Sequence, residues 1–330
     1  MQQKTSNLIT RAKILANIRE WFNKNDFFEV ETPILVNCPD LSPNLNILET
    51  EIHPATVETQ NFASLQNRKI KKYLITSPEF SMKKLLSLQE MNNIFTITKV
   101  FRDGEEYTGI HSIEFTMLEW YRKNADYNDV MKDTENLIDF LSANVETVFK
   151  PVYTTPFPRL KISALFKKYS KIDKVEELKL PVFTKIVHSR GYSKDRNLNY
   201  EQCFNLLFLN EIEPKLPKTP FFLIDYPAPL ACLAKLKKNN PLLAERFELY
   251  INEIELCNGF SELTDGKEQL ARFQHENRER EKFGKPELPI DYELCEKLNF
   301  IGKAGGNALG IDRLVMILLR VKTIDKVLPF

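Results

Sequence analysis

Two arginines next to strongly apolar segments constrain the fold of this 330-residue chain more than any other feature. Arg102 follows the β-rich stretch IFTITKVF and precedes an acidic loop. Arg313 follows a glycine-rich segment and begins an almost wholly apolar one. An unpaired charge beside buried surface is strongly unfavourable, so each arginine needs an anion. Two such arginines beside glycine-rich backbone predict a binding site for a polyphosphate.

Composition is that of a globular protein without a general attraction for polyanions. Hydrophobic residues make up 43% of the chain, and 46 Lys and Arg oppose 45 Asp and Glu. This balance argues against a dedicated nucleic-acid binder, because phosphate contacts supply most of such affinity. The cysteines are scattered without a C-x-x-C pair, so we expect reduced thiols rather than disulfides or a zinc site. With neither a signal peptide nor a membrane-spanning run, we expect a cytoplasmic protein.

The N-terminal region predicts a helix followed by a strand. Residues 7–24 place Ile14, Ile18, Trp21 and Phe22 on one helical face. The following segment, FFEVETPIL, is typical of a strand that Pro33 confines to an edge or a bulge. A surface helix with an edge strand is a sufficient interpretation of both patterns.

Residues 73–90 predict a strand, a sharp turn and a helix. Ser77 is expected as the N-cap, Pro78 as the first helical residue, and Glu79 near the positive end of the helix dipole. These preferences explain the turn without any function. A turn held by its own cap is also a rigid place to present a carboxylate to a ligand.

A β-hairpin is predicted from 94–101 paired with 114–122. Alternation along the second strand places Glu119 and Tyr121 on the same face as Phe115 and Met117. A carboxylate with a phenol two positions later, on an otherwise apolar face, is suited to bind an ammonium group. A solvated outer face is the alternative.

The segment RFELYINEIELCNGFSE predicts a second hairpin with its turn at 252–253. This turn pairs Tyr250 with Glu255 and places Glu248 diagonally across from Glu255 on the same face. Adjacent carboxylates repel each other, so the pattern favours a cation, and magnesium with ATP phosphates suits it. Glu262, after a bend expected at 258–259, adds a third acid. An exposed acidic hairpin is the alternative.

The C-terminal segment GGNALGIDRLVMILL predicts a glycine-rich turn followed by a buried helix. Gly305, Gly306 and Gly310 permit close backbone approach and unusual φ values. Apolar residues then recur at helical spacing, at Ile311, Leu314, Val315, Leu318 and Leu319. Arg313 lies near the start of this helix, where it adds to the dipole that favours a phosphate.

In this pattern, segments 101–122 and 305–319 resemble motifs 2 and 3 of the class II aminoacyl-tRNA synthetases, and the first helix and strand resemble motif 1. From about residue 5 to residue 325 the chain is similar to the catalytic domain of lysyl-tRNA synthetases. The resemblance implies an α+β fold with an antiparallel sheet flanked by helices. It also implies a homodimer formed through motif 1. We expect residues 1–330 to form one catalytic domain without the anticodon-binding OB domain.

That shorter form resembles the elongation factor P–lysine ligases, a family of synthetase paralogues that modify a protein lysine. The similar segments include EFTMLEWYR, ELCNGFSELTD and ARFQHENRERE. The resemblance implies ATP-dependent activation of a lysine-type amino acid, (R)-β-lysine in that family, and its transfer to elongation factor P. It makes tRNA an unexpected partner. A stand-alone synthetase that charges tRNA and an inactive regulatory paralogue are the alternatives, and the retained arginines and acids argue against the latter.

The resemblance also implies roles for individual residues. Arg102 and Arg313 are expected to be catalytic. Expected to bind the amino acid are Ser77, Pro78, Glu79, Glu119, Tyr121, Glu262 and Ala308. Expected to bind ATP are Arg102, Asp103, Gly104, Glu105, Ser112, Glu255, Leu256, Gly310 and Arg313. Magnesium is expected on Glu248 and Glu255.

The chain departs from the lysyl-tRNA synthetases at two places. Ala308 stands where those enzymes have glycine, and its methyl group would crowd an α-amino group but suit the shifted amino group of β-lysine. The loop RDGEE is one residue longer than usual, which leaves open whether Glu105 or Glu106 meets adenine.

Overall fold

A nine-stranded mixed sheet forms the centre of the computed structural model, which describes residues 2–53, 69–104, 109–144 and 155–329. The strands follow the order β1-β5-β6-β12-β11-β10-β8-β7, and β9 pairs with β10. They are β1 (Phe28–Glu29), β5 (Asn93–Phe101), β6 (Glu114–Lys123), β7 (Arg159–Lys161), β8 (Phe221–Pro227), β9 (Leu236–Lys237), β10 (Asn240–Ile251), β11 (Ile254–Ser261) and β12 (Ala304–Gly310). Pairing is antiparallel except at the two edges, where β1 joins β5 and β7 joins β8 in parallel. The predicted α+β class is confirmed.

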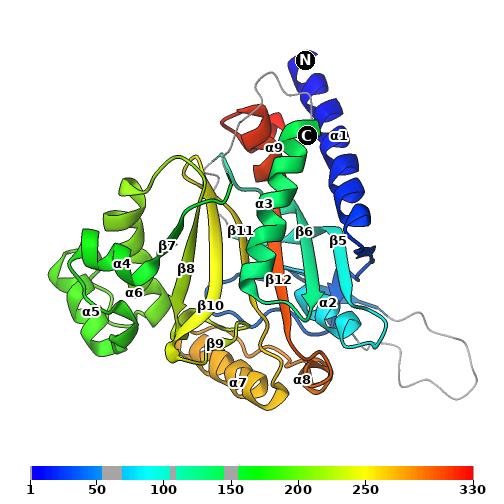
Figure 1. The fold of residues 1–330 in the computed structure, drawn as a ribbon. Coiled ribbons are helices and arrows are strands. Elements are labelled where there is room, and N and C mark those ends of the chain that lie inside the picture. Colours follow the sequence, from blue (N-terminus) through cyan, green and yellow to red (C-terminus); the bar gives the residue numbers. More distant parts are fainter. Residues whose placement is uncertain (1, 54–68, 105–108, 145–154, 330) are drawn as a thin grey trace, which may run out of the picture.

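Three helices cover one face of this sheet: α1 (Gln2–Lys24), α3 (Tyr127–Asn144) and α9 (Ile311–Leu319). Figure 1 shows α1 and α3 lying along the sheet, and the two helices contact each other. The predicted apolar face of α1 is confirmed, because Ile14, Ile18, Trp21 and Phe22 are all buried against the sheet. Phe22 stacks on Phe95 of β5 with ring centroids 4.5 Å apart.

A helical unit packs at the β7–β8 edge, on the left in Figure 1. It contains α4 (Ile162–Leu165), α5 (Leu180–Ser189) and α6 (Tyr200–Leu207), with short π- and 3₁₀-helical turns between them. Phe166, Phe183 and Phe204 fill its core, which also contacts Phe221 of β8 and Tyr250 of β10. The unit therefore joins the sheet through a continuous apolar core.

The lower end of the sheet in Figure 1 carries α2 (Glu79–Leu86), α7 (Gly266–Lys282) and α8 (Tyr292–Leu298). A small sheet of β2 (Leu35–Val36), β4 (Ile70–Leu74) and β3 (Glu49–Ile52) forms separately. The segment expected as one strand, FFEVETPIL, divides between two sheets, with β1 on one side of Pro33 and β2 on the other. Proline has no backbone N–H group to donate to a neighbouring strand, so it separates two short strands here.

Helix α2 begins one residue later than predicted, with Pro78 as its N-cap. The Ser77 hydroxyl nevertheless accepts a hydrogen bond from the Glu79 amide at 3.0 Å. The serine therefore satisfies a free helical N–H group, as an N-cap side chain does. It does so from one position further out than expected.

Two predictions about glycine were wrong. The segment 304–310 is strand β12 rather than a turn, and Gly305, Gly306 and Gly310 are not among the residues with positive φ. The expected bend at 258–259 is likewise an uninterrupted part of β11. Close approach is what Gly259, Gly305 and Gly306 require: a Cβ on Gly259, for example, would lie 2.5 Å from the Phe247 ring.

The first and last helices are joined by a buried ion pair. Arg11 of α1 contacts Asp312 of α9 at 2.5 Å and donates to the Thr116 hydroxyl of β6 at 2.9 Å. Asp312 also accepts the Thr116 amide at 2.7 Å. These contacts fix the start of α9 against the middle of the sheet. No described helix is both long enough and apolar enough to cross a membrane.

Candidate active site

A cleft of about 590 Å³ opens over the central strands, beside the helical unit. A smaller cavity of about 130 Å³ adjoins it and shares part of its lining, including Arg102, His111 and Arg313. Both predicted catalytic arginines therefore lie at the junction of the two spaces. The lining includes residues of β6, β10, β11 and β12 and runs from Asp40 to Arg313, so that segments more than 200 residues apart in the chain meet here.

Three of the predicted acids gather at one end of the cleft, and we refer to this group as the acidic pocket. It consists of Glu79, Glu119 and Glu262 together with Lys83 and Tyr121. The Lys83 amine lies 2.5 Å from Glu79 and 2.6 Å from Glu262. Glu119 is fully buried and accepts hydrogen bonds from Ser77 at 2.5 Å and from Tyr121 at 2.8 Å.

Burial controls the charge of the acidic pocket. It raises the pKa of Glu119 to about 8, helped by the charge of Glu79. It also raises the pKa of Glu262 to about 8, although the nearby Lys83 opposes the shift. Burial would lower the pKa of Lys83 itself, but Glu262 and Glu79 outweigh that effect and raise it. The pocket thus holds a permanent cation among carboxyl groups that ionise reluctantly.

The predicted amino-acid-binding residues lie at different depths. Ser77, Glu79, Tyr121 and Ala308 line the cleft. Glu119 and Glu262 are not among the lining residues and lie directly behind Tyr121 and Gly306. Gly306 allows this arrangement, because a Cβ there would lie 2.4 Å from Oε1 of Glu262. Pro78 caps α2 outside the lining.

The two arginines also line the cleft, and we call them the arginine site. Arg313 donates to the Glu255 carbonyl at 2.8 Å, and its second nitrogen lies 2.6 Å from Nε2 of His111. Arg102 donates to the Thr76 carbonyl at 3.4 Å, and its guanidinium lies 5.3 Å from the centre of the Phe115 ring. Arg313 also forms a long ion pair with the Glu255 carboxylate, at 3.9 Å.

The hairpin β10–β11 has the predicted turn and pairing. Its turn residues Asn252 and Glu253 both have positive φ, and Tyr250 pairs with Glu255. An irregularity after Leu249 then shifts the register, so that Glu248 lies opposite Asn258. The Glu248 side chain accepts hydrogen bonds from Arg246 at 2.7 Å and Tyr250 at 3.3 Å. Burial first, and then the charge of Glu255, raise its pKa to about 7.

This pair of carboxylates is the predicted metal site. Within the described residues no group of three or more His, Cys, Asp or Glu side chains could hold a metal ion. Two mutually repelling carboxylates, Glu248 and Glu255, fit an ion that takes most of its ligands from water and phosphate, as magnesium does. They do not fit a metal held by protein ligands alone.

The remaining predicted ATP-binding residues divide into two sets. Ser112, Leu256 and Gly310 line the smaller cavity. Asp103 and Gly104 are exposed on the loop outside both linings, where Asp103 forms an isolated β-bridge with Asn46. Glu105 and the alternative Glu106 lie outside the described residues.

Among the residues of the site that sequence reasoning missed are Lys83, His111 and Arg246. Lys83 lies four residues after Glu79 on α2, and Arg246 two residues before Glu248 on β10, so helical and strand spacing could have indicated both pairs. His111 carries no such local signal, because it meets Arg313 across 202 positions of sequence.

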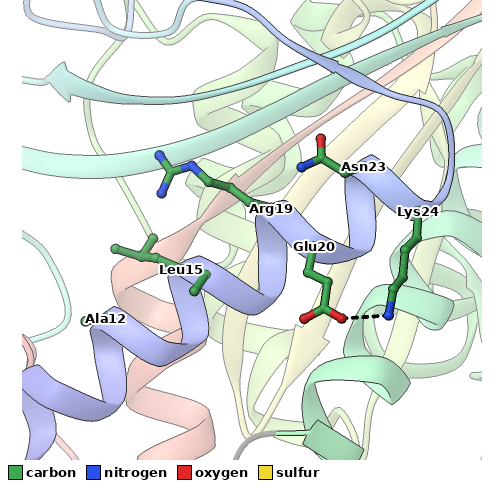
Figure 2. A pocket seen from close by; sticks show the side chains of 7 residues that line it. Ala12, Leu15, Arg19, Glu20, Asn23 and Lys24 are labelled. Carbon is green, nitrogen blue, oxygen red and sulfur yellow. Dashed lines mark hydrogen bonds and ion pairs between the residues drawn. The ribbon is translucent and has the colours of Figure 1, made fainter.

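A second, shallow hollow runs along the outer side of α1 and is lined by residues of that helix alone. It is lined by Ala12, Leu15, Ala16, Arg19, Glu20, Asn23 and Lys24. Figure 2 shows these side chains on successive turns of one helix, with Glu20 and Lys24 paired. It is a helix surface rather than a catalytic cleft.

Comparisons with known proteins agree with this geometry. Residues 1–330 match the family described as tRNA synthetases class II (D, K and N). An elongation factor P--(R)-beta-lysine ligase of Proteus mirabilis is 36% identical over 328 residues, which cover 98% of this chain and 94% of the relative. Proteins of the same name from Mannheimia succiniciproducens and Actinobacillus succinogenes are each 34% identical, covering 98% and 99% of this chain and 94% and 96% of the relatives.

Proposed function

This chain belongs to the class II tRNA synthetases of the D, K and N type, and from that premise we propose that it is an ATP-dependent ligase. It activates (R)-β-lysine as the aminoacyl-adenylate and transfers it to a lysine side chain of elongation factor P. The names of relatives that share about a third of its residues over almost their whole length support this assignment.

One observation carries the proposal: the acidic pocket and the arginine site open into the same cleft. Glu79 and Tyr121 line it, and Arg102 and Arg313 line it as well. Buried carboxylates bind ammonium groups, whereas the arginines bind phosphates. A cleft with both sets of groups holds a diamino acid with its carboxylate directed toward a nucleoside triphosphate.

The first step forms the adenylate. The carboxylate of the amino acid attacks the α-phosphorus of ATP, the bond to the β-phosphate oxygen breaks, and pyrophosphate leaves. Arg102 binds the α-phosphate and Arg313 the γ-phosphate. The attacking carboxylate is already ionised, so no general base is needed. Positioning and charge stabilisation therefore supply the acceleration.

The second step transfers the activated acyl group. The uncharged amine of the acceptor lysine attacks the adenylate carbonyl, an amide bond forms, and AMP leaves with the electrons of the broken anhydride bond. During both steps Glu79 holds the amino group nearer the carboxylate, while Glu119, Tyr121 and Glu262 hold the distal ammonium. Ala308 limits the space beside the reacting end.

Glu248 and Glu255 would hold Mg²⁺ beside the phosphates. Bound there, the ion neutralises charge that develops on the phosphate oxygens. Arg246 keeps Glu248 oriented toward the cleft through its 2.7 Å contact. Ser112, Leu256 and Gly310 of the smaller cavity would contact the nucleotide.

We also propose that the protein is a cytoplasmic homodimer whose described chain forms a single catalytic unit. The hollow on α1 (Figure 2), with its small side chains Ala12 and Ala16, supports pairing of two copies along this helix. One sheet contains strands from residue 28 to residue 310, which supports a single unit. All five cysteines are free thiols, as a reducing compartment favours.

The test is ATP–pyrophosphate exchange with (R)-β-lysine, with (S)-α-lysine and without amino acid, followed by mass spectrometry of elongation factor P. We expect exchange that favours β-lysine and a mass increase of one β-lysyl residue on the acceptor. A clear preference for α-lysine together with charging of tRNA would replace the proposal with a stand-alone synthetase. Absence of exchange with both would indicate a regulatory paralogue.

A further inference from the structure

Lys83 is the one fully buried lysine in the described part of the chain, and none of the predicted roles includes it. It lies on α2 one turn after Glu79, with its amine between Glu79 and Glu262 and 5.3 Å from the centre of the Phe260 ring. A buried lysine without partners would lose its proton. Here two carboxylates and an aromatic face keep it charged.

The charges of the acidic pocket match a diamino acid. Three carboxylates and one ammonium leave an excess of two negative charges when all groups are ionised. A diamino acid brings two ammonium groups and makes the pocket neutral, whereas an amino acid with one ammonium leaves a buried carboxylate without a partner. An unpaired buried charge is strongly unfavourable, so the balance selects for two ammonium groups.

We propose that Lys83 is a positioning residue for the amino-acid substrate. It orients the Glu79 and Glu262 carboxylates and favours the ionised form that binds ammonium groups, and thereby sets the preference for a diamino acid. This inference rests on the proposed function and deepens it. In this role Lys83 acts through the carboxylates rather than by touching the substrate.

The directions of the individual oxygen atoms support this role. Lys83 contacts Oε1 of Glu79 and Oε2 of Glu262, so each carboxylate keeps its other oxygen for a ligand. Oε1 of Glu262 has no hydrogen-bond partner, although the residue is 98% buried, since its exposed fraction is 2%. This oxygen lies beside Gly306, which lines the cleft. A buried acceptor held in that direction suits an incoming ammonium group.

The other titratable groups near Lys83 are acids. Glu119 and Tyr121 face it from β6, Glu262 from the end of β11, and Asp40 from the loop before β3 adds negative charge near Glu79. Lys83 lowers the pKa of all three pocket glutamates against the effect of burial. Its removal would therefore leave a larger fraction of them protonated at neutral pH.

The test compares Lys83→Met with a matched control, Lys84→Met, in pyrophosphate exchange between pH 6 and pH 9. Lys84 is the next residue on the same helix and pairs with Asp291 at 2.7 Å and Glu293 at 2.9 Å, away from the cleft. In Lys83→Met we expect KM for the amino acid to rise about tenfold at pH 7, the change expected for one pKa unit. The pH at which KM levels off should rise by about one unit, while KM for ATP stays unchanged. Lys84→Met should retain the wild-type profile.

A second variant covers the case in which Lys83→Met does not fold. Lys83→Gln keeps an N–H donor in the pocket but removes the charge, and it should show the same shift of the pH profile. An unshifted profile with unchanged KM for the amino acid in either folded variant would overturn the role of Lys83. That result differs from failure of the proposed function, in which the wild-type protein itself would show no exchange with any diamino acid.

Discussion

The acidic pocket and the arginine site hold their charges in different ways. In the acidic pocket, Lys83 already pairs with two carboxylates, and Glu119 already receives two hydrogen bonds from neighbouring side chains. At the arginine site, Arg313 contacts a carbonyl oxygen and an imidazole nitrogen, and its nearest approach to a carboxylate oxygen, in Glu255, is 3.9 Å. The acidic pocket is therefore built from close ion pairs, whereas Arg313 has a carboxylate partner only at a longer distance.

This difference suits the ligands expected in each place. Ammonium groups of a small amino acid are recognised by number and position, so a buried pocket with a fixed charge gives selectivity. Phosphates carry enough charge to displace the partners of Arg313, and pyrophosphate must leave after each turnover. The long ion pair of Arg313 permits that release, whereas close buried ion pairs would oppose it.

The largest expected effect comes from the arginine site. Arg313→Ala should reduce pyrophosphate exchange by ~10³-fold or more, because it removes a charge that stabilises the transferring phosphates. Binding of (R)-β-lysine alone, measured by calorimetry, should remain within about twofold, since the acidic pocket is unchanged. A wild-type rate of exchange in Arg313→Ala would show that the arginine site does not bind the phosphates as described.

A change of pH should act mainly on the acidic pocket. Glu119 and Glu262 have pKa values of about 8, above the ordinary value of 4.5, so below pH 8 they must release protons to bind ammonium groups. For each proton that must be released, we expect KM for the amino acid to fall about tenfold per pH unit between pH 6 and pH 8. Above pH 8 it should level off. Calorimetry in two buffers of different ionisation enthalpy should detect that release. Equal pH dependence of KM for ATP would contradict the separation.

The smallest expected effect concerns Ala308, which pairs with Glu119 across β12 and β6 and lines both cavities. Ala308→Gly should shift the ratio of kcat/KM from β-lysine toward α-lysine by about fivefold, within the range for one methyl group in a pocket. Exchange with each amino acid at saturating ATP measures this ratio. A shift in KM for ATP instead would assign Ala308 to the nucleotide side.

Local periodicity predicted the parts of the site that lie on single elements. Alternation along β6 correctly placed Glu119 beside Tyr121, and the two now share a 2.8 Å hydrogen bond. The turn at 252–253 correctly paired Tyr250 with Glu255. These predictions depend only on the two-residue repeat of a strand and on the geometry of a short turn.

The same reasoning failed at glycine positions and at contacts between distant parts of the sequence. A glycine is equally suited to a turn and to close packing, and at Gly259 and Gly306 packing against a neighbouring ring or carboxylate decides. The pairing of Lys83 with Glu262 joins positions 179 residues apart in the sequence, which no local pattern reveals. The core of the helical unit between β7 and β8 likewise depends on contacts between residues far apart in the sequence.

Strand β12 lies between β6 and β11 at the centre of the sheet, yet it follows all the other described strands in the sequence. Until it leaves the ribosome, both neighbours present open edges, which readily pair with other chains. Arg11 likewise waits for Asp312, its partner 301 positions later. A nascent chain therefore completes this sheet only after residue 310 has been made, and a product truncated before residue 304 would be exposed to aggregation and proteolysis.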